Sequence, residues 1–458
     1  MAYRTETDSM GSMEVPQEAH YGCQTQRAIL NFPISGQPLP FPFIRALAFL
    51  KLHAARTNSE IGLLEKSLAD SIIVAAEEII EKKHISQFQV DVFQTGSGTS
   101  TNMNINEVLA SIANETINGK RGGKNPVHPN DHVNMGQSSN DMIPSALHVA
   151  AVFEITEKLL PSLEILQKAL KEKKEAFSHI PKLGRTHLQD AVPLFLGDEF
   201  GAYAKQIELA IRRLKTILPD LGQLALGGTA VGTGLNTHPD FATKTISRMA
   251  TETKLPFTEA EDHFEAQGAQ DAAVLASGTL KTIAVSLSKI ANDIRWLASG
   301  PRCGLGEITL PSLQPGSSIM PGKVNPVMCE MMLQVSAQVI GCDAAITIGG
   351  LGGVLELNVM LPVISYNLLL AIDLLSSATK VFAEKCIVGI TANEEVCKQN
   401  IEKSLAMVTG LVPHIGYDDA ADIAKEAYAT GKTIRQVVTE KNIISPDILN
   451  EILTYIKK

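Results

Sequence analysis

The feature that most constrains the fold of this chain is a set of long stretches with helical periodicity. Apolar residues recur at helical spacing through residues 138–178, 192–217, 270–297, 326–348 and 357–386. At 1.5 Å per residue, helices of about 25–40 residues extend about 35–60 Å. Helices of that length pack side by side, so we expect a mainly all-α protein with a central long-helix bundle.

The character of the chain changes twice along its length. Short helical patterns alternate with polar loops up to residue 137, and short capped patterns return near residue 391. We therefore predict an N-terminal domain over 1–137, a central bundle domain over 138–390 and a small helical domain over 391–458.

The most apolar part of the chain is residues 357–372, which contain no charged side chain. This window is about a turn short of a membrane span and contains Pro362, so a buried core helix is the favoured interpretation and no membrane is expected. Such a helix is covered either within its own chain or by another subunit. A five-helix monomer offers few ways to cover it on every side, which favours association of subunits.

Net charge and cysteine spacing limit the classes of function. A formal net charge of −9 argues against nucleic-acid binding, although a few basic residues in a cleft still suit a small anionic substrate. The six cysteines show neither CxxC nor zinc spacing, which predicts reduced thiols and no metal site. No targeting segment is recognisable, so we expect a cytoplasmic location.

Four polar loops precede apolar helical patterns. They are the opening stretch and residues 95–107, 127–141 and 184–193, all rich in Ser, Thr, Asn or Gly. Helix N-termini present free N–H groups and partial positive charge, so several of them directed at one cavity would bind carboxylates. Ordinary helix capping explains any single loop equally well.

A fifth loop, "QPGSSIMPGKVNP", carries two adjacent serines, Ser317 and Ser318. A serine needs activation to act as nucleophile or base. Lys323 and Asn325 suit the anchoring of a carboxylate, which favours proton abstraction from the carbon α to it. The resulting charge would move onto the carboxylate oxygens as an aci-carboxylate. A hydrolytic triad using distant His187 and Glu330 is the alternative.

The histidines differ in their surroundings. His53, His84 and His179 lie in or beside lysine-rich helical stretches and are expected to be solvated, whereas His148 is expected to be packed. His187 follows a threonine in a polar loop that we expect to enter a helix. It is therefore the favoured proton-transfer residue.

Taken together, the loops identify a family. "GSSIMPGKVNP" resembles the signature loop of the fumarase/aspartase superfamily, and "TGSGTSTNMNINEV", "HPNDHVNMGQSSND", "GRTHLQDAVP", "GGTAVGTGLN" and "IANDIRWLASGPRCGLGEI" are similar to class II fumarase in order and spacing. The resemblance covers essentially the whole chain. It implies a three-domain fumarase/aspartase-like fold whose central helices form a tetrameric core, with active sites shared between subunits and no cofactor.

The resemblance also implies roles for individual residues. Ser317 would remove the C3 proton of malate, His187 would serve the hydroxyl side through a water, and Glu330 would orient or polarise His187. Substrate contacts are implied at Ser97, Gly98, Thr99, Ser138, Ser139, Asn140, Thr186, Ser318, Lys323, Val324 and Asn325. The reaction would be reversible anti addition of water to fumarate.

A second anion site is implied at His128, Pro129, Asn130 and Asp131. A basic residue shortly before this segment is replaced here by Asn125, so the site would have to use Lys124 or Arg121.

Two other functions stay open at this point. "LELNVMLP" and "TANEEVC" lean toward aspartate ammonia-lyase, whereas "TGSGT" and "QSSND" favour fumarase. A non-catalytic structural homologue is disfavoured because every candidate catalytic residue is present.

Overall fold

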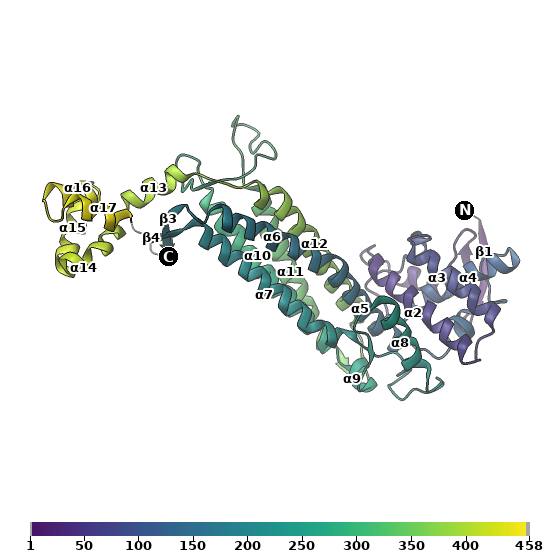
Figure 1. The fold of residues 1–458 in the computed structure, drawn as a ribbon. Coiled ribbons are helices and arrows are strands. Elements are labelled where there is room, and N and C mark those ends of the chain that lie inside the picture. Colours follow the sequence, from purple (N-terminus) through teal and green to yellow (C-terminus); the bar gives the residue numbers. More distant parts are fainter. Residues whose placement is uncertain (1, 455–458) are drawn as a thin grey trace. The chain divides into compact units, whose positions relative to one another are not determined.

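The computed structural model describes residues 2–454 and is mainly helical, as predicted (Figure 1). Its α-helices are α1 (Cys23–Asn31), α2 (Phe41–Glu60), α3 (Lys66–Ile80), α4 (Thr99–Asn118), α5 (Ser139–Glu154), α6 (Leu160–Ala176), α7 (Leu196–Gly222), α8 (Phe241–Thr253), α9 (His263–Gly268), α10 (Asp271–Leu297), α11 (Val327–Gly350), α12 (Leu361–Lys385), α13 (Glu394–Lys403), α14 (Val412–Ile415), α15 (Tyr417–Thr430), α16 (Ile434–Glu440) and α17 (Pro446–Thr454).

The strands within residues 2–454 are short and pair two by two. The antiparallel pairs are β1 (Tyr3–Asp8) with β2 (Gly11–Pro16), β3 (Pro181–Thr186) with β4 (Gln189–Phe195), β7 (Ile308–Thr309) with β10 (Thr391–Ala392), and β8 (Gly353–Val354) with β9 (Leu357–Asn358); the parallel pair is β5 (Gln223–Leu224) with β6 (Thr258–Glu259). These small sheets brace loops and form no layer of their own.

The long helices agree with the predicted segments except at three places. The segment 357–386 begins with strand β9, Leu357–Asn358, and its helix α12 starts only at Leu361. The segment 138–178 is not one helix, because a π-helical turn, Ile155–Leu159, separates α5 from α6. The segment 192–217 does not begin as helix, because its first residues belong to β4 and α7 starts at Leu196. Strand pairing with β3 overrides the helical pattern there.

The chain packs into two compact units, each made of three stretches of sequence. The first comprises Met1–Pro161, Ile211–Ala284 and Val335–Ser377, and the second comprises Ser162–Ala210, Val285–Gln334 and Ala378–Lys458. Four long helices, α7, α10, α11 and α12, contribute one part to each unit. The division into three domains drawn from the sequence stays a prediction.

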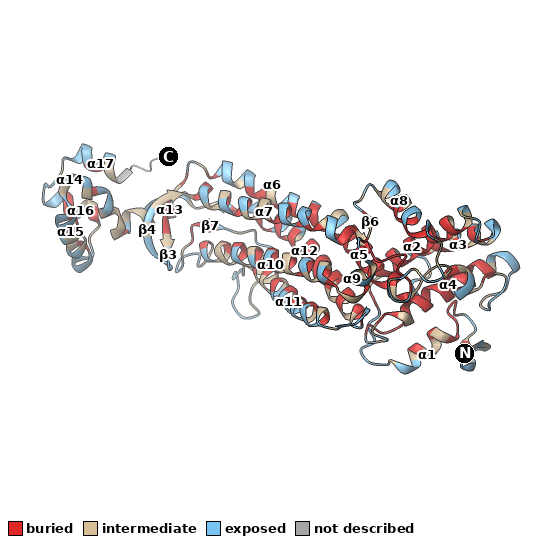
Figure 2. Ribbon diagram, turned by 90° about the horizontal axis from the view of Figure 1, so that it is seen from below, coloured by how far each residue is buried: buried red, intermediate tan, exposed pale blue. Residues whose placement is uncertain are grey.

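Burial follows the amphipathic pattern within each unit (Figure 2). In the first unit, α2 and α5 are buried along most of their length, including the fully buried side chains of Phe43 and Leu47. In the second unit, the C-terminal helices enclose a small core of their own around Val437 and Val438.

The long helices α10, α11 and α12 expose much apolar surface. Three helices, Asp271–Leu297, Val327–Gly350 and Leu361–Gly389, are long and apolar enough to cross a membrane by length and composition alone. Only a third of the most apolar window of Val327–Gly350 is buried within this chain. This exposed apolar surface agrees with the expectation that one chain cannot cover these helices by itself.

Candidate functional site

Two of the predicted substrate loops lie together in the first unit, at the N-termini of α4 and α5. Gly98 is the N-cap of α4 with φ +72, and a Cβ there would lie 2.8 Å from the side chain of Ile143 on α5. A glycine is therefore needed both for the backbone conformation and for the close approach. Ser97 Oγ and Thr99 Oγ1 are 2.8 Å apart, so these hydroxyls share a hydrogen bond.

The N-terminus of α5 is built as a capping box. The Ser138 hydroxyl accepts the N–H of Asn140, while the Asp141 carboxylate accepts the N–H of Ser138 at 2.9 Å. Ser139 Oγ accepts an N–H from Asn102 Nδ2, in α4, at 3.1 Å. These bonds hold the two helix N-termini together, which is the arrangement that favours a bound anion.

The glycine-rich loop 227–236 supports α5 from behind. Asp141 is fully buried, and its second carboxylate oxygen accepts the N–H groups of Gly227 at 3.1 Å and Thr229 at 3.0 Å. Burial raises the pKa of Asp141, and the three backbone N–H groups oppose that shift. Asn140 Nδ2 donates to the carbonyl of Ala230 at 2.8 Å. The loop therefore fixes Asn140, a predicted substrate residue.

Lys51, in the middle of α2, is a buried cation behind the same loops. Its Nζ donates to Asn134 Oδ1 at 2.9 Å and to Gln137 Oε1 at 2.8 Å. Burial lowers the pKa of Lys51 to about 7, and the carboxylate of Asp141 opposes that shift. Nothing in the sequence distinguished Lys51 from an ordinary polar position of an amphipathic helix.

His187 lies in the second unit, at the tip of the β3–β4 hairpin. Thr186 pairs with Gln189, so His187 and Leu188 form a two-residue turn with φ of +57 and +58. Both residues left-handed is the mark of a type I′ turn. The expectation that this loop enters a helix directly was wrong, since a whole strand precedes α7. Thr186 and His187 are exposed, so both side chains are accessible to a small molecule.

A buried ion cluster anchors the base of this hairpin. Arg185 donates to both oxygens of Glu307, at 3.0 and 2.9 Å, and Lys182 Nζ lies 3.3 Å from the same carboxylate and 2.7 Å from Glu199. Asn400, on α13, adds a bond to Glu307 at 3.1 Å. Lys182 and Glu307 are buried. The cluster thus fixes Arg185, two residues before His187, to the interior of the protein.

The loop that carries Ser317 is closed at its neck by its own backbone. Gly316 N–H donates to the carbonyl of Lys323 at 2.7 Å, and Asn325 Nδ2 donates to the carbonyl of Gly316 at 2.7 Å. Ser318, Lys323 and Val324 are exposed, while Asn325 is half-buried. The side-chain amide of Asn325 therefore donates a hydrogen bond within the loop itself.

The Ser317 hydroxyl sits inside a turn of this loop. Its Oγ accepts the backbone N–H groups of Ile319 at 3.2 Å and Met320 at 3.0 Å. Two donors on one oxygen favour its anionic form. Nearby, α11 begins at Val327, one residue later than the predicted segment 326–348, and places half-buried Glu330 in its first turn.

The predicted site residues thus occupy three places. The first unit brings residues 97–99 and 138–140 together, and the second unit holds the His187 turn and the Ser317 loop with Glu330. No hydrogen bond among residues 2–454 joins His187 to Ser317, so the alternative of a hydrolytic triad finds no support within one chain. The described residues also contain no group of three or more His, Cys, Asp or Glu side chains placed to hold a metal ion.

Comparison with known proteins gives the family. A lyase family model matches residues 11–341, and a model described as the fumarase C C-terminus matches residues 407–457. A protein named fumarate hydratase class II from Corynebacterium glutamicum is 53% identical over 98% of this chain and 94% of its own length. The chain belongs to the class II fumarate hydratase family. A relative with the same name from Neisseria meningitidis is 52% identical over 99% of this chain and 98% of its own length.

A solved structure agrees with the fold as well. The crystal structure of class II fumarase from Schistosoma mansoni superposes with a TM-score of 0.95 at 41% identity, covering 99% of this chain and 98% of the other. The predicted fumarase/aspartase-like fold is confirmed.

The second anion segment, which the family resemblance singled out, forms a π-helical turn, Pro129–Val133. His128 Nδ1 accepts the N–H groups of Asn130 and Asp131, both at 3.1 Å, so the ring proton of the neutral imidazole lies on Nε2. Burial lowers the pKa of His128. Arg121 is engaged by Glu115 and Glu18, which leaves Lys124 as the available cation. Anion binding here stays a prediction.

Two histidine predictions have clear outcomes. His148 is packed as expected, with Nδ1 2.8 Å from the carbonyl oxygen of Gln223. The expectation for His53 was wrong, because its side chain is completely buried against Phe49, with ring centroids 4.4 Å apart. Lysine-rich surroundings in sequence did not report its position on the inner face of α2.

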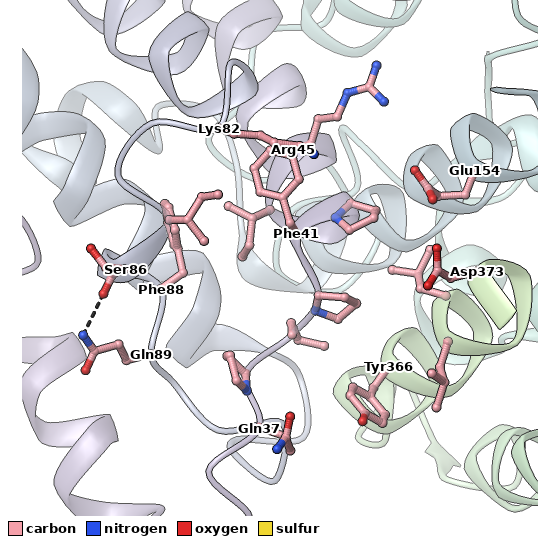
Figure 3. A pocket seen from close by; sticks show the side chains of 18 of the residues that line it. Gln37, Phe41, Arg45, Lys82, Ser86, Phe88, Gln89, Glu154, Tyr366 and Asp373 are labelled. Atoms are coloured by element: carbon pink, nitrogen blue, oxygen red, sulfur yellow. Dashed lines mark hydrogen bonds between the residues drawn. The ribbon is translucent and has the colours of Figure 1, made fainter. Parts of the chain in front are cut away.

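A large cavity of the first unit lies outside the predicted site. Its volume is about 1130 Å³, and none of the predicted catalytic or binding residues lines it. Tyr366 and Asp373 project from α12 toward the segment of Gln37 and Phe41 (Figure 3).

Proposed function

We propose that this chain catalyses the reversible hydration of fumarate to L-malate. The observation that carries the proposal is identity above 50% over nearly the whole chain to proteins named fumarate hydratase class II. The site residues implied by the family are all present, and two of the substrate loops meet at paired helix N-termini.

Ser317 is the proposed base. In the malate-to-fumarate direction its alkoxide takes the C3 proton, and the C–H electron pair moves onto the adjacent carboxylate as an aci-carboxylate. The Ile319 and Met320 N–H groups support this role because they stabilise charge on Oγ before the proton arrives. The electron pair then returns to form the C=C bond while the C–O bond breaks.

His187 is the proposed partner on the hydroxyl side. The departing hydroxyl leaves as water after it receives a proton from His187, directly or through one water, with Glu330 orienting or polarising the imidazole. Hydration runs the same steps backwards. Exposure at a hairpin tip with a fixed base suits a residue that must reach a substrate held by other loops.

The carboxylates of the substrate are the proposed ligands of the remaining residues. Ser97, Gly98 and Thr99 would face them from α4, and Ser138, Ser139 and Asn140 from α5. Both groups place hydroxyl or amide side chains at a helix N-terminus, whose partial positive charge favours an anion. Thr186, Ser318, Lys323, Val324 and Asn325 complete the proposed contacts.

The proposed assembly is a homotetramer whose active sites take loops from several subunits. Support comes from exposed apolar residues on the long helices, among them Val285 on α10 and Ile348 on α11, which are 54% and 62% exposed in one chain. Association would cover them and would bring the His187 turn and the Ser317 loop of different chains to one substrate. The cytoplasmic location stays a prediction.

The experiment follows the ultraviolet absorbance of fumarate, with malate or aspartate as the sole substrate. Formation of fumarate from malate but not from aspartate is expected. Fumarate from aspartate would replace the proposal with aspartate ammonia-lyase, and no reaction with either would favour a non-catalytic homologue.

A Ser317→Ala variant tests the base. It is expected to keep the native mass and circular dichroism of the wild type, since Ser317 lies in a loop, and to lose turnover by about 10³-fold or more. Turnover within tenfold of the wild type would remove Ser317 from the role of base.

A further inference from the structure

Lys51 is a buried cation to which the proposed mechanism gives no role. It is completely buried on α2, yet its ammonium bonds only to the side-chain oxygens of Asn134 and Gln137 among the described residues, with no ion pair. The buried Asp141 carboxylate acts on Lys51 through space but forms no hydrogen bond or ion pair with it, so burying this charge is costly and its retention calls for a use.

An ammonium group can only donate hydrogen bonds, and this fixes the orientation of its neighbours. Asn134 must turn its oxygen toward Lys51, and its Nδ2 then donates to the carbonyl of Gln137 at 3.1 Å. Gln137 must do the same, and its Nε2 donates to the carbonyls of Val133 and Met135.

The same constraint passes to α4 and α5. Asn134 Oδ1 also accepts from Asn102 Nδ2 at 3.2 Å, so Asn102 must direct its NH₂ group to this side. The second hydrogen of that NH₂ group goes to Ser139 Oγ at 3.1 Å. Ser139 is therefore an acceptor toward Asn102, and its own hydroxyl hydrogen is left to be donated elsewhere.

We propose that Lys51 is a positioning residue for the substrate. Through Asn134 and Asn102 it makes the hydroxyl of Ser139 a donor toward the carboxylate of the bound dicarboxylate, and it places positive charge behind the two helix N-termini. The proposal rests on the proposed function, because it takes Ser139 as a substrate contact.

The test compares Lys51→Met with the wild type in two backgrounds. Methionine keeps an unbranched side chain as far as the Cε position and removes both donor and charge. The KM for fumarate and malate is expected to rise about tenfold or more, while kcat changes less than threefold, because an oriented bond to a charged group is lost in substrate and transition state alike. In a Ser139→Ala background the same substitution is expected to raise KM less than threefold.

A direct binding measurement separates this inference from the proposed function. Succinate, a saturated dicarboxylate that is not turned over, is titrated calorimetrically, and its Kd is expected to rise in parallel with KM. If the wild type turned over no fumarate, the proposed function would fail, and the succinate titration would still judge Lys51.

Controls address folding and charge. Lys281→Met removes a half-exposed lysine that pairs with Asp343, and it is expected to leave KM within twofold of the wild type. Lys51→Gln keeps hydrogen-bonding groups without charge and serves if methionine prevents folding; it too is expected to raise KM. Wild-type KM and succinate Kd in the Lys51 variants, or additive effects with Ser139→Ala, would overturn the proposal.

Discussion

The buried imidazole of His53 makes a quantitative prediction about acid stability. Burial, together with smaller contributions from Arg56 and Arg248, lowers its pKa from the ordinary 6.5 to about 3. Glu252 lies 3.6 Å from Nε2, but it is half-exposed and shared with Arg56, so burial prevails. The folded chain therefore keeps His53 neutral at pH values where the unfolded chain protonates it.

The magnitude follows from linkage between protonation and folding. The contribution of neutral His53 to the free energy of unfolding is fully present above pH 6.5. It falls as the pH decreases toward 3, since only the unfolded state binds the proton in that window. At pH 5 this amounts to about 2 kcal/mol, a value that depends on the unfolded pKa and hardly on the folded one.

The perturbation is His53→Phe, which keeps the ring contact with Phe49 and cannot titrate. Neither ring nitrogen of His53 has a hydrogen-bond partner among the described residues, so phenylalanine breaks no hydrogen bond. Urea unfolding followed by circular dichroism at pH 7.5 and 5.0 gives the free energy of unfolding. The wild type is expected to lose about 2 kcal/mol more than the variant between these two pH values.

His179→Gln, at an exposed position, is the matched control and should follow the wild type at both pH values. Equal losses in His53→Phe and the wild type would refute the reasoning, because they would mean that His53 takes up its proton without unfolding.

Two further predictions concern the hairpin and the assembly. Glu307→Gln leaves Arg185 and Lys182 without their buried carboxylate; it is expected to destabilise the fold by about 3–5 kcal/mol in urea unfolding and to lower turnover. The exposed pair of Glu402 and Arg435 is the control, since Glu402→Gln should cost under about 1 kcal/mol. Light scattering of the wild type is expected to give about four times the 49.2 kDa chain mass. Equal stability of Glu307→Gln and Glu402→Gln, or a monomeric mass, would contradict the respective reasoning.

The long helices could be predicted from the sequence because their apolar periodicity is local. The segment 270–297 became α10 almost residue for residue. The β3–β4 hairpin was missed because strand pairing depends on a partner that helical periodicity does not reveal.

The candidate site was predictable in its exposed loops but not in its support. Ser317 and His187 belong to stretches whose residue types suit catalysis, and the family resemblance supplied their predicted roles. Lys51 and Glu307 act through buried contacts with residues 83 and 122 positions away, so no local pattern pointed to them.

The bond between Asp141 and the 227–236 loop has a consequence for how the protein is made. Its partners are separated by 86 and 88 positions, so a growing polypeptide on the ribosome carries the start of α5 long before Gly227 and Thr229 emerge. Until then the carboxylate lacks two of its three backbone donors. A nascent or prematurely terminated chain that ends before this loop therefore lacks the finished candidate site, which is completed only late in synthesis.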